Sequence, residues 1–137
     1  MAENVIVDAG FVVALLSSRD THHHWAATQA RQFPPPWSTC DAVLSESVHL
    51  LGEAGRAALV ALLRREALAP VFDLRDDVDA VLKLLEKYGD VPAGLADACL
   101  IRMTETLPNP VVLTTDADFR VYRRHGRQVI PIVMPGR

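Results

Sequence analysis

The stretch Val5-Ile6-Val7-Asp8-Ala9-Gly10 decides the fold, because it reads as a short buried strand that ends in a carboxylate and a glycine. Consecutive β-branched apolar residues are typical of strands that are buried on both faces of a parallel sheet. A second stretch, Val111-Val112-Leu113-Thr114-Thr115, runs in the same way into Asp116. Since the carboxyl ends of parallel strands meet at one edge of an open α/β sheet, we expect Asp8 and Asp116 to lie at the same edge.

Strand and helix patterns alternate along the rest of the chain. We expect further strands over residues 37–39, 69–72 and 129–133, the last at a sheet edge because it contains Pro131. Helices are expected over 10–16, 20–33, 39–51, 57–68 and 119–124, from Asp76 to Gly89, and after Pro92. Asp20 and Thr39 are the expected N-caps of the second and third of these helices, and residues 52–55 read as a break. This alternation predicts an α/β three-layer sandwich, in which helices flank both faces of a central, mainly parallel β-sheet.

Length and composition indicate one ordinary domain over residues 1–137. Half of the residues are hydrophobic and 23% are charged, which is globular composition. The formal net charge of -3 argues against a generally basic nucleic-acid coat protein, although a local basic patch stays compatible with it. No apolar run approaches the roughly 20 residues that cross a bilayer, and no positive segment precedes the first apolar stretch. We therefore expect a cytoplasmic protein without a membrane partner.

The cysteines and the histidine run are interpreted as packing residues. Cys40 and Cys99 are the only cysteines, and their number and separation do not suit a disulfide framework or a thiolate metal site. We therefore expect two small buried side chains. In His22-His23-His24, successive helical positions point about 100° apart, so three in a row do not converge on one ion.

Two further carboxylates lie in apolar stretches that read as helices. Glu46 follows Val43-Leu44-Ser45, and Asp97 lies within Leu95-Ala96-Asp97-Ala98-Cys99. Burying an acid in such a stretch is costly unless something pairs with it. Two charges about 4 Å apart repel by roughly 4 kcal/mol at an effective dielectric near 20, so converging carboxylates need a counter-charge. A hard divalent cation with oxygen ligands, Mg²⁺ or Mn²⁺, is the natural one.

These acidic blocks, taken in order, resemble those of PIN domains, especially of the VapC-like group. The resembling blocks are Val7-Asp8-Ala9-Gly10-Phe11, Ser45-Glu46-Ser47-Val48, Leu95-Ala96-Asp97-Ala98 and Thr115-Asp116-Ala117-Asp118-Phe119. The resemblance implies an endoribonuclease that depends on Mg²⁺ or Mn²⁺ and hydrolyses RNA phosphodiester bonds. It also implies a protein that is often the toxin of a toxin–antitoxin pair and commonly a homodimer.

The resemblance assigns both catalysis and metal binding to Asp8, Glu46, Asp97 and Asp116. It leaves Asp118 as either a secondary ligand or a loop residue. From their position, Thr114 and Thr115 could hydrogen-bond Asp116 or a phosphate. The arginines at 120, 123, 124 and 127 either grip RNA phosphates or form a solvated turn. The apolar helices of residues 43–68 either fill the core or offer a face to a second copy or to an antitoxin.

Two other classes of protein compete with the nuclease interpretation. The first is a catalytically silent PIN-like module that binds RNA or protein without cutting, and intact acids at all four positions disfavour it. The second is a receiver-type domain that accepts a phosphoryl group on Asp8. The absence of an Asp-x-Asp sequence at Asp8, and of any lysine after Lys87, weakens this second alternative.

Overall fold

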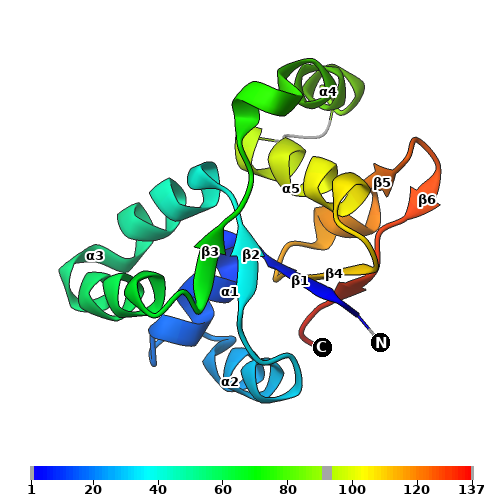
Figure 1. Cartoon of the computed structure of the whole chain (residues 1–137). Coiled ribbons are helices and arrows are strands. Elements are labelled where there is room, and N and C mark those ends of the chain that lie inside the picture. Colours follow the sequence, from blue (N-terminus) through cyan, green and yellow to red (C-terminus); the bar gives the residue numbers. More distant parts are fainter. Residues whose placement is uncertain (1, 91–93, 137) are drawn as a thin grey trace.

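A five-stranded parallel sheet forms the centre of the molecule (Figure 1), which a computed structural model describes for residues 2–90 and 94–136. The strands run in the order β3-β2-β1-β4-β7, and every neighbouring pair is parallel. They comprise β1 (Asn4–Val7), β2 (Trp37–Thr39), β3 (Leu68–Pro70), β4 (Pro110–Leu113) and β7 (Ile132–Val133). The two strands that the sequence marks most clearly, β1 and β4, are therefore direct neighbours at the centre of this sheet.

Within the described part of the chain, five α-helices cover the two faces of this sheet and confirm the predicted α/β sandwich. The helices are α1 (Ala9–Leu16), α2 (His23–Gln32), α3 (Asp41–Arg64), α4 (Leu74–Lys87) and α5 (Leu95–Thr106). Side chains alternate across the sheet as a pleated strand requires. Ile6 and Val112 belong to a core with α4 and α5, whereas Val7 and Leu113 belong to a core with α1, α2 and the second half of α3. No helix among the described residues is long and apolar enough to cross a membrane.

The long helix α3 is kinked where the sequence predicts a break. Gly52 has φ 63° and ψ -164°, which lies outside helical geometry and in a region that favours glycine. The first half of α3 reaches the core that contains α5, through Val43, while Leu59 and Leu62 of the second half pack on the opposite face of the sheet. Leu44 and Leu51 of the first half also pack against the second core, so α3 contributes to both cores on the near side of the kink as well.

Several predicted boundaries in the first half of the chain are wrong for local reasons. The side chain of Asp20 accepts a hydrogen bond from the His22 amide at 2.8 Å, so it closes a turn three residues before α2. Thr39 is still part of β2, and its hydroxyl donates to the Val7 carbonyl at 2.9 Å instead of capping α3. The residue before α3 is Cys40.

The boundaries around β3 and α4 also differ from the expected ones. The helix expected to reach residue 68 ends at Arg64, because Glu66 adopts a positive φ of 59°. Strand β3 accordingly comprises Leu68–Pro70 in place of 69–72. Helix α4 begins at Leu74, earlier than expected, and the Asp73 side chain caps it. Pro92, expected to precede α5, lies outside the described residues.

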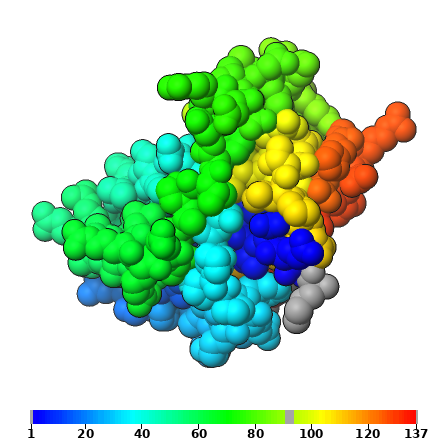
Figure 2. Space-filling view, in the orientation of Figure 1, coloured from blue at the N-terminus to red at the C-terminus, as the bar shows by residue number. Residues whose placement is uncertain are grey.

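The segment after β4 contains a hairpin where a helix was expected. A short 3₁₀ helix, η1 (Ala117–Arg120), is followed by strands β5 (Arg123–Arg124) and β6 (Gln128–Val129), which pair antiparallel. Three residues, 125–127, connect the paired Arg124 and Gln128, and two of them, His125 and Gly126, have positive φ, as tight hairpin loops commonly require. Figure 2 shows this hairpin standing out from the surface beside α5. The strand expected over 129–133 is thus divided between β6 and β7, and β7 lies at the predicted sheet edge.

Candidate functional site

One pocket is lined by all four acids that the sequence singles out. Asp8 directly follows β1, Asp116 follows β4, Glu46 lies on α3 and Asp97 lies in the first turn of α5. The pocket has a volume of about 190 Å³, and its wall is completed by Ala9, Gly10, Val43, Leu50, Ala96, Leu100 and Thr115. We call it the acid pocket. Residues far apart in the chain thus meet at the carboxyl edge of the sheet, as the topology requires.

Asp8 is the most firmly held of these acids. Its backbone is tied to β4 by a hydrogen bond from its amide to the Leu113 carbonyl at 3.3 Å. Its side chain caps α1, because Oδ1 accepts the Phe11 amide at 2.9 Å. The Thr114 hydroxyl donates a short hydrogen bond to Oδ2. With 7% of its surface exposed, Asp8 presents a nearly immobile carboxylate to the pocket.

The Thr114 side chain joins the two acids that follow strands. Besides donating to Asp8, its oxygen accepts the Asp116 amide at 2.9 Å. The side chain of Asp116 in turn accepts the Asp118 amide at 2.9 Å, through Oδ1, and so starts η1. The expected hydrogen bond between Thr114 and Asp116 is therefore present, made to the backbone of Asp116. Asp118 does not line the acid pocket, which favours the loop alternative for this residue.

Gly10 allows the start of α1 to approach Thr115 closely. A Cβ at position 10 would lie 2.0 Å from Thr115 Oγ1 and 3.3 Å from Asp8 Oδ1. Both distances are shorter than ordinary van der Waals contact, and the first leaves no room for a methyl group. The glycine that follows the first strand in the sequence therefore serves packing at the acid pocket.

Asp97 is held by α5 itself and by a tyrosine that sequence reasoning did not identify. Its Oδ2 accepts the Gly94 amide at 3.4 Å and the Tyr122 hydroxyl at 3.2 Å. The Tyr122 ring is fully buried and packs edge-on against Phe119 and Tyr88. In the sequence, the spacing of Phe119 and Tyr122 reads only as apolar packing, so it gives no signal that this hydroxyl reaches an acid.

Glu46 differs from the other three acids because the protein does not restrain its side chain. It is exposed on the first half of α3, and its carboxylate makes no hydrogen bond or ion pair with the described residues. A glutamate with three side-chain torsions keeps considerable rotamer freedom in such a setting. Glu46 can therefore adjust its position toward a ligand in the acid pocket.

The acid pocket concentrates negative charge. The pKa of Asp8 is raised to about 6, chiefly by burial and also by the charges of Asp116 and Asp97, against the hydrogen bonds from Thr114 and Phe11. Burial likewise raises the pKa of Asp97, and the charges of Asp116 and Glu46 add to the rise. Neither Lys, Arg nor His is found among the described residues that line the pocket. The repulsion between the acids thus has no counter-charge from the protein itself.

The acids nevertheless do not form a ready-made ligand cluster. Within residues 2–90 and 94–136, no three His, Cys, Asp or Glu side chains are grouped closely enough to hold one metal ion. The histidine run gives no site either, because the Nδ1–H of His23 donates to the Ala14 carbonyl at 2.8 Å while His24 is exposed. Oxygen-only donors and uncompensated negative charge still match the preference of Mg²⁺ and Mn²⁺.

Only part of the arginine cluster is available to bind RNA. The Arg123 guanidinium donates to the carbonyls of Arg120, Val121 and Tyr122, and Arg124 donates to the Thr104 carbonyl. The Arg124 side chain therefore holds the hairpin against α5, while the Arg123 side chain is occupied by the backbone just before it. Arg120 and Arg127 are exposed and form no ion pair or side-chain hydrogen bond with any described residue.

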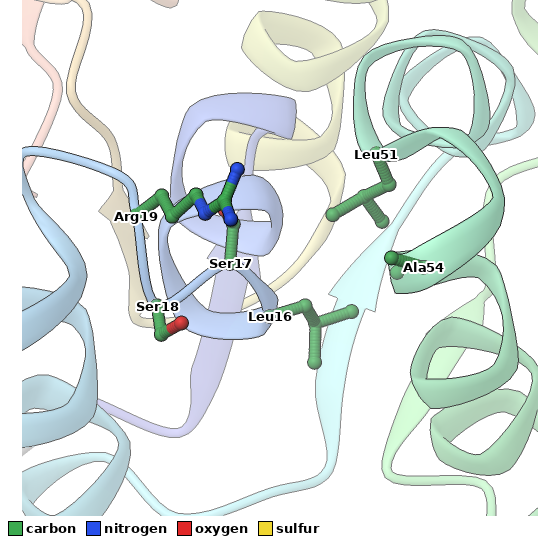
Figure 3. A pocket seen from close by; sticks show the side chains of 7 residues that line it. Leu16, Ser17, Ser18, Arg19, Leu51 and Ala54 are labelled. Atoms are coloured by element: carbon green, nitrogen blue, oxygen red, sulfur yellow. The ribbon is translucent and has the colours of Figure 1, made fainter.

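A larger hollow elsewhere on the surface lacks the chemistry of the acid pocket. It has a volume of about 530 Å³ and lies between the loop after α1 and the part of α3 beside the Gly52 kink. Figure 3 shows Leu16 and Leu51 facing each other across it, with Arg19 on the loop. Its lining residues include no carboxylate, so its size does not make it the better candidate for a cation site.

Comparisons with known proteins identify the family and the fold. The family model of the PIN domain matches residues 5–124, and the chain belongs to this family. Among solved structures, it is similar to VapC20 of Mycobacterium tuberculosis, described as a toxin that cleaves the Sarcin-Ricin loop. The two chains share 22% identity and a TM-score of 0.74 over 86% of this chain and 94% of VapC20, which shows a common fold. No curated protein matches the sequence.

Proposed function

We propose that this protein is an endoribonuclease of the VapC type, which hydrolyses RNA phosphodiester bonds with the help of Mg²⁺ or Mn²⁺. The observation that carries the proposal is the acid pocket, where four carboxylates from separate elements line one cavity and no Lys, Arg or His is found among the described lining residues. Membership in the PIN domain family and the fold shared with an RNA-cleaving toxin support the same reaction class.

Asp8, Glu46, Asp97 and Asp116 would hold the cation. A divalent cation supplies Lewis-acid chemistry, which makes water a better nucleophile at neutral pH and neutralises charge that develops on the phosphoryl and leaving oxygens. The carboxylate oxygens keep lone pairs for this purpose. Each Asp8 oxygen accepts one hydrogen bond from the protein, and no donor within the described residues reaches Asp97 Oδ1 or Asp116 Oδ2.

The protein's own contribution is orientation. Thr114 and the amide of Phe11 fix the plane of the Asp8 carboxylate, and Tyr122 steadies Asp97. Preorganised ligands lower the cost of arranging the reacting groups, and outer partners of metal ligands commonly change affinity by ~10- to 100-fold. We infer that Arg120 and Arg127, which lie beyond Asp116 with free guanidinium groups, bind RNA phosphates near the scissile bond.

Exposed apolar side chains support protein partners for this nuclease. Leu74, Val78 and Leu82 follow one another at helical spacing along α4 and are 37%, 43% and 49% exposed. Val48 and Leu50 are exposed on the first half of α3. A stripe of this kind suits contact with another protein chain. We infer a homodimer and a binding surface for an antitoxin, in line with the VapC type of fold.

A cleavage assay distinguishes the nuclease from a PIN-like module that binds RNA or protein without cutting. The untagged protein is incubated with total RNA in Mg²⁺, in Mn²⁺ and in EDTA, beside D97N prepared in parallel. We expect discrete fragments with either cation and none in EDTA or with D97N. Equal cleavage by D97N, or cleavage that persists in EDTA, would contradict the assignment. Retained RNA binding with no cleavage under any condition would favour the binding module.

A further inference from the structure

One hydroxyl group in the acid pocket has no partner within the described residues. It belongs to Thr115, which lines the pocket, is partly buried and directly precedes Asp116. No residue in the described ranges forms a hydrogen bond with this hydroxyl. The neighbouring Thr114 is different, because its hydroxyl already joins Asp8 to the Asp116 amide. Of the two threonines, Thr115 is therefore the one whose hydroxyl is available to a ligand.

The same hydroxyl is the only side-chain hydrogen-bond donor among the described residues that line the acid pocket. The other lining residues are the four acids, whose ionised carboxylates only accept hydrogen bonds, and residues with apolar side chains or none. A phosphodiester oxygen carries negative charge and also only accepts. The carboxylates repel such an oxygen, so Thr115 is the side chain of the pocket that suits it.

The close approach of Gly10 places this hydroxyl beside Asp8. A Cβ at position 10 would lie 2.0 Å from Thr115 Oγ1 and 3.3 Å from Asp8 Oδ1, so these two oxygens lie on either side of one point. That point is in the first turn of α1, whose opening amides lack intrahelical acceptors and attract negative charge. The hydroxyl thus lies next to the most firmly held acid and at a part of the pocket that favours an anion.

We propose that the Thr115 hydroxyl donates a hydrogen bond to a non-bridging oxygen of the scissile phosphate. This inference rests on the proposed nuclease function and adds to it a contact with the substrate. The hydrogen bond orients the phosphate relative to the acids and stabilises negative charge that grows on the phosphoryl oxygens during cleavage. The hydroxyl keeps its proton throughout, and Thr115 forms no covalent bond with the RNA.

Two complementary substitutions separate the hydroxyl from the rest of the side chain. T115V keeps the shape and removes the hydroxyl, whereas T115S keeps the hydroxyl and removes the methyl group. The substrate is a short RNA that spans a bond cut in the total-RNA assay. For its cleavage in Mn²⁺ we expect kcat/KM to fall at least ~10-fold in T115V and to stay within about threefold of the wild type in T115S. T106V is the matched control, since Thr106 is exposed at the end of α5 and does not line the pocket.

Two binding measurements complete the test without turnover. In calorimetric titrations, T115V is expected to bind Mn²⁺ as the wild type does, because Thr115 is not one of the proposed ligands. In a D97N background, which is expected not to cleave, T115V should weaken the binding of the same RNA about threefold, measured by fluorescence anisotropy. This effect is smaller than the loss in kcat/KM because the hydrogen bond strengthens as charge develops on the phosphate.

Three results would overturn this contact and leave the nuclease function intact. In the first, T115V cleaves RNA as fast as the wild type. In the second, T115S loses as much activity as T115V, so the side chain acts through packing. In the third, T115V lowers Mn²⁺ affinity together with cleavage, so Thr115 acts through the neighbouring Asp116. A wild-type protein that cuts no RNA contradicts the proposed function itself, and this contact with it.

Discussion

The two sides of the acid pocket hold their carboxylates very differently. On the side of the strand ends, Asp8 is buried and accepts two hydrogen bonds, and the Thr114 hydroxyl ties it to Asp116. On the helix side, Glu46 of α3 is exposed and unrestrained, and Asp97 of α5 receives hydrogen bonds at 3.2 Å and 3.4 Å. One side is therefore preorganised, while the other can still adjust.

This difference suggests how the acids can accept a cation without forming a ready-made cluster. Crowding all four carboxylates in advance would cost repulsion that no basic residue of the pocket offsets. Asp8 and Asp116 would fix the position of the cation, and Glu46 would move toward the cation once it is bound. The strand-end acids should therefore contribute most to cation affinity, and the unrestrained Glu46 least.

Replacing one acid from each side tests this asymmetry and has the largest expected effect. We expect D8N to lose cleavage by at least ~100-fold, and E46Q by about 10-fold, with part of the E46Q loss recovered at higher Mn²⁺ concentration. Asparagine caps helices about as well as aspartate, so D8N should keep α1 and its fold. Cleavage rates over a Mn²⁺ series, with circular dichroism as the folding control, give the comparison.

Equal losses for D8N and E46Q, neither recovered by Mn²⁺, would show that the two sides of the pocket are equivalent. A D8N variant with wild-type cleavage would remove Asp8 from the site altogether. A substitution outside the pocket, D79N, serves as the matched control, because Asp79 is exposed and pairs only with Lys83 on α4.

The same asymmetry explains how much of the site was readable from the sequence. Asp8 and Asp116 each follow an apolar run, and parallel strands bring such ends together, so their proximity followed from local pattern and topology. The placement of Glu46 and Asp97 rested on resemblance to the PIN family, because a carboxylate in an apolar helix can face a pocket, a partner or solvent. The central strands were predicted within one or two residues for the same reason.

Features that depend on tertiary contacts had no sequence signal. Tyr122 reaches Asp97 only because η1 and the hairpin fold back against α5. Cys40 and Cys99, both buried as predicted, line one pocket only because the start of α3 and the middle of α5 contribute to the same core. The helix predicted over 119–124 is wrong beyond Arg120, because the chain turns at His125 and Gly126 and forms a hairpin. The hydrogen bonds from Arg123 and Arg124 to backbone carbonyls depend on that hairpin and have no sequence signal.

The pH dependence of the free energy of unfolding tests the burial of Asp8. The pKa of Asp8 is about 6 in the folded protein, above the ordinary value of 3.8. Between these values the folded state binds more protons than the unfolded state, so this group makes stability fall as pH rises. The full shift corresponds to about 3 kcal/mol. In EDTA we therefore expect D8N to become more stable than the wild type as pH rises from 4 to 7.

The measurement is the difference in unfolding free energy between wild type and D8N, from denaturant titrations at each pH. Carboxylates that do not interact with Asp8 affect both proteins alike and cancel in this difference. A difference that stays constant from pH 4 to 7 would mean that Asp8 ionises freely in the folded protein. Mg²⁺ should reduce the advantage of D8N at pH 7, because a cation that binds only the folded wild type stabilises it.

The smallest expected effect concerns the tyrosine on the adjustable side. Y122F removes the hydroxyl that donates to Asp97 at 3.2 Å but keeps the ring between Phe119 and Tyr88. Because this hydrogen bond lowers the pKa of Asp97, its loss should raise that pKa further and weaken Mn²⁺ binding about fivefold, the equivalent of about 1 kcal/mol. The loss should grow as pH falls, since more Asp97 is then protonated.

Calorimetric titration of Mn²⁺ at several pH values measures this effect, and Y88F is its matched control. Tyr88 belongs to the same ring cluster, but its hydroxyl accepts the Arg123 amide at 2.8 Å and does not reach the acids. If both variants lose affinity equally and without pH dependence, the tyrosines act only through packing. A pH-dependent loss confined to Y122F would identify it as a positioning residue for Asp97, and would show that the adjustable side is also held in place, by a weaker contact.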